Sequence, residues 1–455
     1  MNNLSAIILA AGQGTRMKSS LPKVMHKVGQ KPLIWHILHN ITQTKIDDIV
    51  AVIGPDTDVL TNFLHAEFGQ VQHVLQKERL GTAHAVLTGL EAVQHKQDNI
   101  AVLYGDTPFV KTSTIEKMNA MIEDDVAVVV LGFIAKNPGR YGRLIKNDQG
   151  ELEKIVEFLD ATDQEKGVNL CNSGMMLING KHLDLLKKID NKNAKEEYYL
   201  TDIVELAKKQ NLRAKHFSVD ETEVLGVNSR SEQVHAEMVM QKMLRRKFLE
   251  EGVTLVEPDT AHFSVDTKIG HDCIIHPNVV FGPGVILHSN VEVKSFSHLE
   301  GAEVKSHSVI GPFARLRPGA NIGEKVKVGN FVEIKNSDLD KNSSVSHLTY
   351  IGDSKIGEGS NIGAGTITCN YDGYNKSKTI IGKNTFIGSN TALVAPVEVG
   401  DGAIVAAGSV ITKNVERNSL VVARGEEKSY AGKADSIRKN AKAKADKLKS
   451  SGNRL

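Results

Sequence analysis

Apolar residues recur at every sixth position, with occasional five-residue steps, through most of the C-terminal half of this 455-residue chain. The series runs from Phe263 to Ile411, and glycines stand beside many of its members. A six-residue period is typical of a parallel β-helix, in which one apolar residue per side points into a narrow core and small residues turn the corners. A random sequence would not keep this period over so many residues, so the period predicts a β-helix.

One polar and aromatic segment interrupts this period at residues 368–376, with the sequence TCNYDGYNK. It adds roughly one extra hexad to the repeat. Loops that leave a regular scaffold often carry function, so we expect this loop to bind a ligand. A tolerated surface insertion is the alternative.

The N-terminus carries a different signal, a short apolar run followed at once by two glycines. The run at residues 6–10 is of the buried parallel-strand type, and Gly12 and Gly14 allow the backbone to approach an anion with its N–H groups forward. Arg16 and Lys23 add positive charge. The spacing fits neither the dinucleotide fingerprint, which needs a third glycine, nor the P-loop, which needs Gly-Lys-Ser/Thr. The segment predicts a phosphate-handling loop, with a glycine turn beside two surface cations as the alternative.

With its Thr-Arg-Met and Leu-Pro-Lys elements, at residues 15–17 and 21–23, this segment resembles the sugar-1-phosphate nucleotidylyltransferases. The resemblance implies a Rossmann-like α/β nucleotide-binding domain with a mostly parallel sheet, in which Arg16 and Lys23 act in catalysis. It also implies that UTP or the UDP-sugar contacts a larger set of residues, matched here by Leu9, Ala10, Ala11, Gly12, Gly14, Lys23, Gln76, Gly81, Thr82, Gly142, Glu157, Asn172 and Asn228.

Two parts of that set have separate tasks by resemblance. The segment that reads uracil is matched by Gln76, Gly81 and Thr82, although Thr82 could instead cap a helix. The segments that contact the sugar are matched by Gly142, Glu157 and Asn172. The two residues after Glu157, Phe158 and Leu159, are more apolar than the family pattern.

Asp106 follows a second apolar run, residues 101–104, at the position where open α/β sheets bind ligands. In the nucleotidylyltransferase family the matching aspartate and a distant residue, matched here by Asn228, hold one Mg²⁺ against the phosphates. The resemblance therefore implies that Asp106 and Asn228 are magnesium ligands. The alternatives are a helix N-cap for Asp106 and a turn position for Asn228.

His347 lies two positions after Val345, an inward residue of the repeat, so its side chain should project outward from a coil. An outward histidine is usually a plain surface residue. The segment from Arg315 to Ile381, however, resembles the acetyltransferase half of the bifunctional enzymes that combine glucosamine-1-phosphate N-acetyltransferase and N-acetylglucosamine-1-phosphate uridylyltransferase activities. The resemblance extends to about Arg424 and implies that neutral His347 takes a proton from the attacking amine.

The same resemblance implies the other contacts of the second site. The sugar phosphate and its ring would be bound by Arg317, Lys335, Tyr350, Asn361 and Lys376. Acetyl-CoA would lie along Ala364, Asn370, Tyr371, Ser389, Ala407 and Arg424. The repeat itself resembles the hexapeptide-repeat acyltransferases, whose coils are left-handed against the usual crossover rule and which assemble as trimers. A homotrimer through the β-helix is therefore implied.

We expect four segments along the chain. They are a nucleotidylyltransferase domain at residues 1–230, a linker helix at 231–252, a left-handed β-helix acetyltransferase domain at 253–427 and a basic tail at 428–455. The tail carries nine Lys or Arg residues against two Asp residues and almost no large apolar residues. This composition predicts a disordered tail.

The overall charge and cysteine content exclude several classes of partner. A formal net charge of +2 gives no general attraction to nucleic acid or to a membrane. Three cysteines without a Cys-x-x-Cys pair argue against both a disulfide framework and a zinc knuckle. No apolar stretch approaches a membrane span or a signal peptide. We therefore expect a cytoplasmic protein that acts on small molecules.

Together these resemblances imply a bifunctional enzyme of UDP-N-acetylglucosamine synthesis. Its C-terminal domain would acetylate glucosamine 1-phosphate with acetyl-CoA, and its N-terminal domain would transfer uridylyl from UTP to the product, with Mg²⁺, releasing pyrophosphate. The alternative is a single-activity nucleotidylyltransferase with a structural or regulatory β-helix, against which His347 and the loop at 368–376 argue. A non-catalytic trimeric scaffold would leave Arg16, Lys23, Asp106 and Asn228 unexplained.

Overall fold

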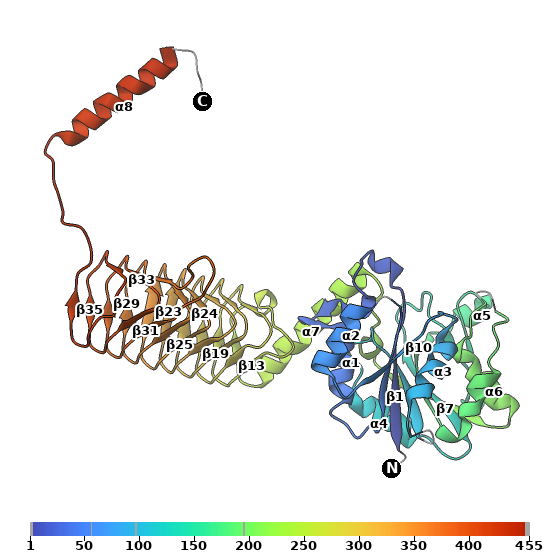
Figure 1. Ribbon diagram of the computed structural model, residues 1–455. Coiled ribbons are helices and arrows are strands. Elements are labelled where there is room, and N and C mark those ends of the chain that lie inside the picture. The colour runs from blue at the N-terminus through green and yellow to red at the C-terminus, as the bar shows by residue number, and fades with distance from the viewer. Residues whose placement is uncertain (1–2, 56, 96–97, 194–195, 451–455) are drawn as a thin grey trace. The chain divides into compact units, whose positions relative to one another are not determined.

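The computed structural model describes residues 3–55, 57–95, 98–193 and 196–450. The chain divides into two compact units (Figure 1). One comprises Met1–Thr267 with Phe281–Gly284, and the other comprises Lys268–Val280 with Val285–Leu455. The helix that the sequence predicts between the domains therefore belongs to the N-terminal unit.

A nine-stranded mixed sheet forms the centre of the N-terminal unit, with the main strand order β11-β7-β10-β6-β1-β4-β5. All neighbours along this path are parallel except β10, which runs antiparallel to β6 and to β7. The strands of the sheet are β1 (Leu4–Ala10), β4 (Ile49–Ile53), β5 (Gln72–Leu75), β6 (Asn99–Tyr104), β7 (Val126–Ile134), β8 (Arg143–Lys146), β9 (Leu152–Val156), β10 (Leu170–Ile178) and β11 (Arg213–Val219). A separate two-stranded sheet holds β2 (Lys27–Val28) and β3 (Lys31–Pro32). The predicted α/β fold class is confirmed.

Helices cover both faces of this sheet. Consecutive residues of a strand point to opposite faces, and here both faces are apolar. In β1, Ile8 belongs to the core completed by α1 and α4, whereas Ile7 belongs to the core completed by α3 and α6. Burial on both faces explains why the strand sequences are almost continuously apolar. The α-helices of this unit are α1 (Leu33–Ile41), α2 (Asp58–Glu67), α3 (Thr82–Ala92), α4 (Thr112–Ala120), α5 (Asp163–Lys166), α6 (Ile203–Lys209) and α7 (Arg230–Glu250). Its 3-10 helices are η1 (Thr15–Met17), η2 (Lys23–Met25), η3 (Gly180–Lys188), η4 (Leu200–Asp202), η5 (Glu221–Val224) and η6 (Pro258–Thr260).

The C-terminal unit is a left-handed parallel β-helix, with short strands in three parallel stacks (Figure 1). The six-residue period predicts the β-helix, and the family resemblance implies its left hand. The first stack holds β14 (Ile274–Ile275), β17 (Glu292–Val293), β20 (Val309–Ile310), β23 (Lys327–Asn330), β26 (Ser344–His347), β29 (Asn361–Ile362), β32 (Phe386–Ile387), β35 (Ile404–Val405) and β37 (Leu420–Val421). The second holds β13 (Lys268–Ile269), β16 (Ile286–Leu287), β19 (Ala302–Val304), β22 (Ala320–Ile322), β25 (Ser337–Leu339), β28 (Ser354–Ile356), β31 (Thr379–Ile381) and β34 (Val397–Val399). The third holds β18 (His298–Leu299), β21 (Arg315–Leu316), β24 (Glu333–Lys335), β27 (Tyr350–Gly352), β30 (Ile367–Cys369), β33 (Ala392–Val394) and β36 (Val410–Ile411). The remaining short strands are β12 (Thr254–Leu255) and β15 (Val280–Phe281).

The six-residue period supplies the core of this β-helix. In the first stack, buried apolar residues pair in register on successive coils, in the order Val293, Ile310, Val328, Val345, Ile362 and Ile387. The first five are 17 or 18 residues apart, whereas the last step takes 25 residues. The longer step contains the segment between β30 and β31, which is where the sequence interrupts its period.

Helix α7 begins after Ser229, whose side-chain oxygen accepts a hydrogen bond from the backbone N–H of Glu232. Its Gln241 side chain bonds both the N–H and the carbonyl oxygen of Phe263, at 2.9 and 2.7 Å. These bonds attach the helix to the end of the N-terminal unit.

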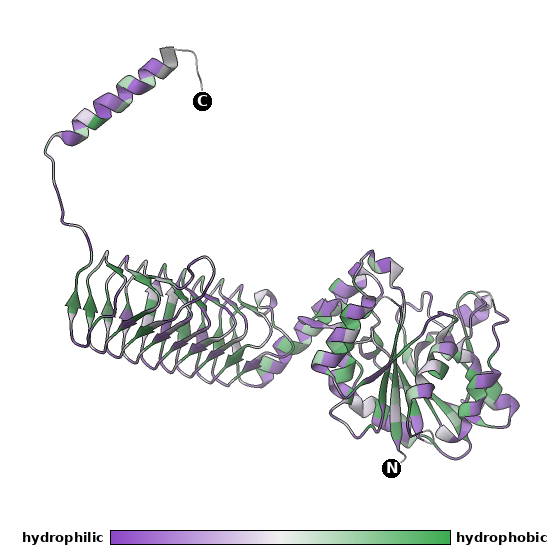
Figure 2. Cartoon of the chain, viewed as in Figure 1, coloured by the Kyte–Doolittle hydropathy of each residue, from purple (hydrophilic) through white to green (hydrophobic). Residues whose placement is uncertain are grey.

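The basic tail is helical where the sequence predicts disorder. Helix α8 spans Lys433–Ser450, and its described side chains are exposed and mostly hydrophilic (Figure 2). Alanine and lysine favour a helix intrinsically, and an Asp435–Arg438 ion pair of 3.0 Å joins successive turns. Among the described residues, no helix has the length and apolar composition needed to cross a membrane.

Candidate active sites

The glycine loop after β1 is folded back on Lys23. Gly14 adopts the left-handed region, with a φ of 63°, directly before η1. A Cβ atom on Gly14 would lie 2.7 Å from the Cβ atom of Lys23, so only glycine permits this approach. The loop therefore brings a cation close to the end of β1.

Lys23 bridges the two residues that the sequence predicts as magnesium ligands. Its Nζ donates a short hydrogen bond to Asp106 Oδ2 and another, of 3.0 Å, to Asn228 Oδ1. Two backbone bonds fix the partners: Val227 N–H donates to the Asp106 carbonyl oxygen at 3.0 Å, and Asn228 N–H donates to Glu232 at 2.7 Å. Two side-chain oxygens thus already face one positive charge.

This pair of oxygens fits a divalent cation. Mg²⁺ commonly takes one or two protein oxygen ligands and completes its shell with phosphate oxygens and water. Across the described residues, no group of three or more His, Cys, Asp or Glu side chains could hold a metal on its own. A cation at Asp106 and Asn228 would therefore complete its shell with water or with oxygens of a bound phosphate ligand.

The segment predicted to read uracil follows β5. Gln76 is buried, its N–H donates to the Ile53 carbonyl oxygen at 2.8 Å, and its Nε2 donates to His84 Nδ1 at 3.0 Å. Gly81 has a φ of 122°, and a Cβ atom there would lie 2.5 Å from the Tyr198 carbonyl oxygen. Thr82 begins α3 without capping it, because its hydroxyl instead accepts a hydrogen bond from Leu200 N–H at 3.0 Å.

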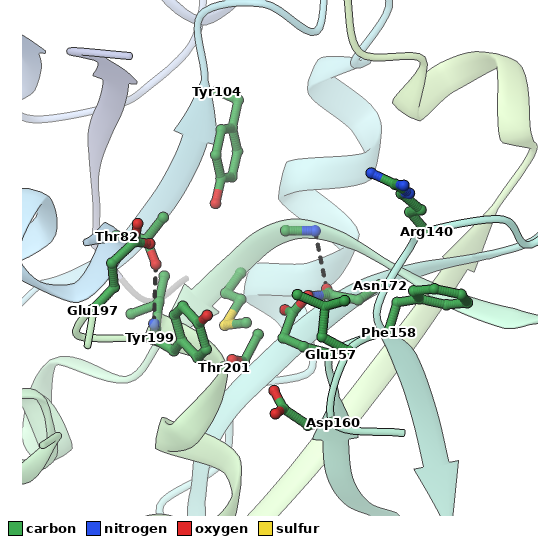
Figure 3. A pocket seen from close by; sticks show the side chains of 14 residues that line it. Thr82, Tyr104, Arg140, Glu157, Phe158, Asp160, Asn172, Glu197, Tyr199 and Thr201 are labelled. Atoms are coloured by element: carbon green, nitrogen blue, oxygen red, sulfur yellow. Dashed lines mark hydrogen bonds between the residues drawn. The ribbon is translucent and has the colours of Figure 1, made fainter. Parts of the chain in front are cut away.

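Two adjoining cavities connect these residues. The first, of about 250 Å³, brings together nine predicted residues of the uridylyl site: Leu9, Ala10, Ala11, Gly12, Lys23, Gln76, Gly81, Thr82 and Asp106. The second, of about 390 Å³, contains Glu157 and Asn172 (Figure 3). The two share Thr82, Tyr104 and Glu197 in their walls. Arg16 is exposed on η1 and is absent from the described lining of both.

Polar side chains, among them Glu157 and Asn172, line part of the second cavity. Asn172 N–H donates to the Gly142 carbonyl oxygen at 2.9 Å, and Asn172 Oδ1 accepts from Gly174 N–H at 2.9 Å. A Cβ atom on Gly142 would lie 3.4 Å from Glu157 Oε1, so the three predicted sugar residues are neighbours. Phe158, which departs from the family pattern, lies under the cations of Arg143 and Lys166, at 5.9 and 5.6 Å from its ring centre.

Several lining residues escaped the sequence motifs. Tyr104 ends β6, and burial together with the carboxylates of Asp106 and Glu157 raises the pKa of its hydroxyl well above the usual range. Its place two residues before Asp106 was a usable signal. Tyr199 and Thr201 come from the segment around η4, which contains no glycine motif, and none of the sequence motifs pointed to them.

In the β-helix, His347 ends β26 with an exposed side chain. Its Nδ1 lies 2.9 Å from Asn330 Oδ1 on the preceding coil, with which it pairs in register. Because an amide oxygen only accepts, Nδ1 donates its hydrogen in this contact, so in the neutral ring the lone pair is on Nε2. The repeat places Asn330 beside His347, but no motif pointed to it.

Three of the residues predicted to bind the sugar phosphate, Arg317, Lys335 and Lys376, lie close to one another. Arg317 pairs with Glu333 at 2.8 Å, and Glu333 is in register with Tyr350. The neighbouring amine of Lys376, and then Arg317, lower the pKa of Lys335. A lysine whose charged form is disfavoured by a neighbouring amine in this way is suited to bind an anion.

The loop between β30 and β31 begins at Asn370, which is buried and donates to Asp353. The hydrogen bonds from Asn336 and Asn370 lower the pKa of Asp353 despite its burial. At the tip, Asp372 Oδ1 accepts bonds from the N–H groups of Tyr374 and Asn375, at 2.8 and 2.6 Å. Tyr371 remains 60% exposed, so its ring is free to contact a ligand.

Several residues predicted to contact acetyl-CoA lie on successive coils from His347 toward the C-terminal end of the β-helix. Gly365 N–H donates to the His347 carbonyl oxygen at 3.2 Å, and Asn390 N–H donates to Ala364 at 2.7 Å. On the next coil, Gly408 N–H donates to the Ser389 carbonyl oxygen at 2.8 Å, and Arg424 reaches the Ala407 carbonyl oxygen at 2.7 Å. Asn361 lies in β29, in register with Ser344 of the His347 strand.

Family comparisons agree with this division. The model described as "MobA-like NTP transferase domain" matches residues 6–161. Within the β-helix, "Bacterial transferase hexapeptide (six repeats)" matches residues 266–301, and "Hexapeptide repeat of succinyl-transferase" matches residues 378–413.

Curated relatives match nearly the whole chain. The "Bifunctional protein GlmU" of Paramagnetospirillum magneticum is 50% identical over 98% of this chain and 99% of its own length. The protein of the same name from Zymomonas mobilis is 47% identical, over 97% and 98% of the two chains. That from Agrobacterium fabrum is also 47% identical, over 98% of each. Both units are thus covered by each alignment.

Proposed function

The chain belongs to the GlmU family of bifunctional proteins, and we propose how its own residues divide two transfer reactions between the two units. It is a bifunctional transferase of UDP-N-acetylglucosamine synthesis, with a nucleotide and an acyl-CoA among its substrates. We assign one reaction to each unit because each unit contains its own cluster of polar side chains. Lys23 with Asp106 and Asn228 belongs to the N-terminal unit, and His347 with Asn330 belongs to the β-helix.

In the N-terminal unit, a phosphate oxygen of N-acetylglucosamine 1-phosphate attacks the α-phosphorus of UTP. One O–P bond forms, the bond from the α-phosphorus to the bridging oxygen breaks, and pyrophosphate leaves. The attacking oxygen is already anionic at neutral pH, so the reaction needs positioning and charge neutralisation more than a base. Lys23 and Arg16 supply positive charge, Gln76 reads the uracil, and Gly142, Glu157 and Asn172 hold the sugar.

Asp106 and Asn228 are the residues that would hold Mg²⁺. Bound there, the ion would neutralise phosphate charge as it develops on the leaving pyrophosphate. Lys23, whose ammonium donates to the same two oxygens, would supply positive charge to a phosphate oxygen beside the ion. The bonds that Val227 and Asn228 make through their backbones support a site held in place before the ligands arrive.

In the β-helix, the amine of glucosamine 1-phosphate attacks the carbonyl carbon of acetyl-CoA. The N–C bond forms and the C–S bond breaks, while His347 Nε2 accepts the amine proton and the departing thiolate is reprotonated. Arg317, Lys335 and Lys376 bind the sugar phosphate, and Tyr350 and Asn361 orient the ring. Acetyl-CoA lies along Ala364, Asn370, Tyr371, Ser389, Ala407 and Arg424. Asn330 fixes the histidine tautomer that can act as a base.

The hexapeptide β-helix indicates an oligomer, and we propose that it is a homotrimer. The exposed loop around Tyr371 supports this, since its ring has room to meet acetyl-CoA at a subunit boundary. Three free cysteines and substrates of central metabolism are consistent with a cytoplasmic location, which we also propose.

One coupled assay tests the assignment. Purified full-length protein receives glucosamine 1-phosphate, acetyl-CoA and UTP, with each omitted in turn, and both free thiol and pyrophosphate are measured. Thiol release should need no UTP, whereas pyrophosphate release from glucosamine 1-phosphate should need acetyl-CoA. EDTA should stop pyrophosphate release alone. If thiol release were absent while N-acetylglucosamine 1-phosphate still gave pyrophosphate, the single-activity alternative would hold.

A further inference from the structure

Arg79 lies in the base-recognition segment, residues 76–82, and its side chain reaches across the edge of the sheet. The guanidinium Nε donates a hydrogen bond of 2.6 Å to the carbonyl oxygen of Ala11, in the glycine loop 68 positions away. The reactions derived above leave Arg79 without a task. Its contact nevertheless joins the two loops between which a uridine nucleotide must fit.

Three strand ends at the same level make this reach possible. Ala10 of β1 pairs with Ile53 of β4, and Ile53 pairs with Leu75 of β5. The loops that follow these strands therefore start at one edge. Arg79 runs from the loop after β5, past the end of β4, to the loop after β1.

Gly54, the first residue after β4, provides the space for the guanidinium. A Cβ atom on Gly54 would lie 2.6 Å from Nη2 of Arg79 and 3.1 Å from the Ala11 carbonyl oxygen. The first distance is too short for a carbon–nitrogen contact, so a side chain at position 54 would push the guanidinium away. The second is tight but can relax by a few tenths of an ångström.

We propose that Arg79 is a positioning residue of the uridylyl site, which holds the base-recognition segment at a fixed distance from the glycine loop. It lines the cavity of about 250 Å³ that also contains Gln76, Lys23 and Asp106. Since one UTP molecule must place its base against the first loop and its phosphates against the second, binding depends on the distance between them. The inference rests on the proposed function of this site.

The first test replaces Arg79 in the full-length protein. Arg79→Ala should raise the KM for UTP by about tenfold or more, the scale of one hydrogen bond from a charged donor. The KM for N-acetylglucosamine 1-phosphate should change little, and thiol release in the acetyl reaction should not change. Lys77→Gln is the matched control, because Lys77 is an exposed cation in the same loop and should leave the KM for UTP unaltered.

Gly54→Ala makes a second test that does not touch Arg79 itself. It should raise the KM for UTP in the natural sequence, because the new methyl group displaces the guanidinium. In the Arg79→Ala background the same substitution should have almost no further effect. Two effects that simply multiply in the double variant would overturn the proposal, because the residues would then act independently.

A series of ligands separates positioning from direct phosphate binding. Calorimetric affinities for UDP and UTP should fall by a similar factor in Arg79→Ala, because both ligands span the two loops, whereas the affinity for inorganic pyrophosphate, which contacts only the glycine loop, should not change. A loss that grows with the number of phosphates would instead make Arg79 a phosphate ligand and would refute the positioning role. If the unsubstituted protein had no UTP-dependent activity, the proposed function itself would fail, whereas normal activity with unaltered variants would remove only this inference.

Discussion

The two units assemble their polar clusters in opposite ways. In the N-terminal unit, Lys23 meets Asp106 and Asn228, which are 83 and 205 positions away along the chain. In the β-helix, His347 meets Asn330, which is 17 positions away on the preceding coil. The first cluster depends on a whole sheet with its crossovers, and the second on one turn of a repeat. A defect in the sheet should therefore damage only the first.

The largest expected effect tests this independence directly. Asp106→Ala should lower uridylyl transfer by about a hundredfold or more, the usual scale for preorganised charge, and leave acetyl transfer near normal. His347→Ala should do the reverse, because His347 is the proposed base for the attacking amine of the acetyl reaction. Separate assays of pyrophosphate and thiol release check both variants. Loss of both activities in either folded variant would show that the sites are not independent.

A smaller effect tests how far one coil of the repeat controls the next. Asn330→Ala should lower acetyl transfer by about tenfold, because the Nδ1–H tautomer of His347 loses its hydrogen-bond acceptor. Asn330→Asp should move the acid limb of the pH profile to higher pH, since a carboxylate stabilises the charged imidazole and so raises its pKa.

Asn321→Ala is the matched control for this pair, because Asn321 bonds Asp338 on another face of the β-helix. An unchanged pH profile in Asn330→Asp would mean that the Asn330 contact does not govern the proton on His347. The coil below the histidine would then have only a structural role.

These two clusters also show why sequence reasoning succeeded unevenly. The period at Val345 and its equivalents predicted the β-helix and the outward direction of His347, because residues one coil apart in the sequence lie side by side in a β-helix. The loop with Gly12 and Gly14 predicts a phosphate site, which stays a prediction, whereas the structure shows the close approach of Gly14 to Lys23 that only glycine permits. Neither signal specified Tyr199 or Thr201, which reach the sugar cavity only through the packing of η4.

In the basic tail, composition alone led to a prediction that differs from the structure. Its charge predicted disorder, yet alanine and lysine at successive positions still favour a local helix, and α8 forms over Lys433–Ser450. Composition decides whether a segment can bury a core. It does not decide whether hydrogen bonds within one segment form.

A third prediction concerns the ammonium that lies between the proposed metal ligands. Lys23→Gln should raise the affinity of the nucleotide-free protein for Mn²⁺ by several-fold, because a fixed positive charge no longer competes for Asp106 and Asn228. Electron paramagnetic resonance of free Mn²⁺ measures this without any turnover. Lys18→Gln, which removes an exposed cation of the same loop, should leave the affinity unchanged. A weaker Mn²⁺ affinity in Lys23→Gln would mean that Lys23 organises the site instead of filling it.

The smallest effect concerns Asp202, beside the sugar cavity. Burial, followed by the nearby carboxylates of Glu205, Asp190, Glu157 and Asp160, raises its pKa to about 6. The folded chain therefore keeps this proton at a pH where the unfolded chain has lost it, and stability falls as the pH rises from about 4 to about 6.

Because solvent partly screens the group, Asp202→Asn should raise the Tm at pH 7 by only about 2 to 4 °C. Below pH 4 the benefit should vanish, since both states of the natural chain are then protonated. Thermal unfolding of both proteins at pH 3.5 and pH 7, with Asp163→Asn as the control on an exposed carboxylate, measures the difference. An equal shift at both pH values would trace the effect to packing of the amide and not to the charge of Asp202.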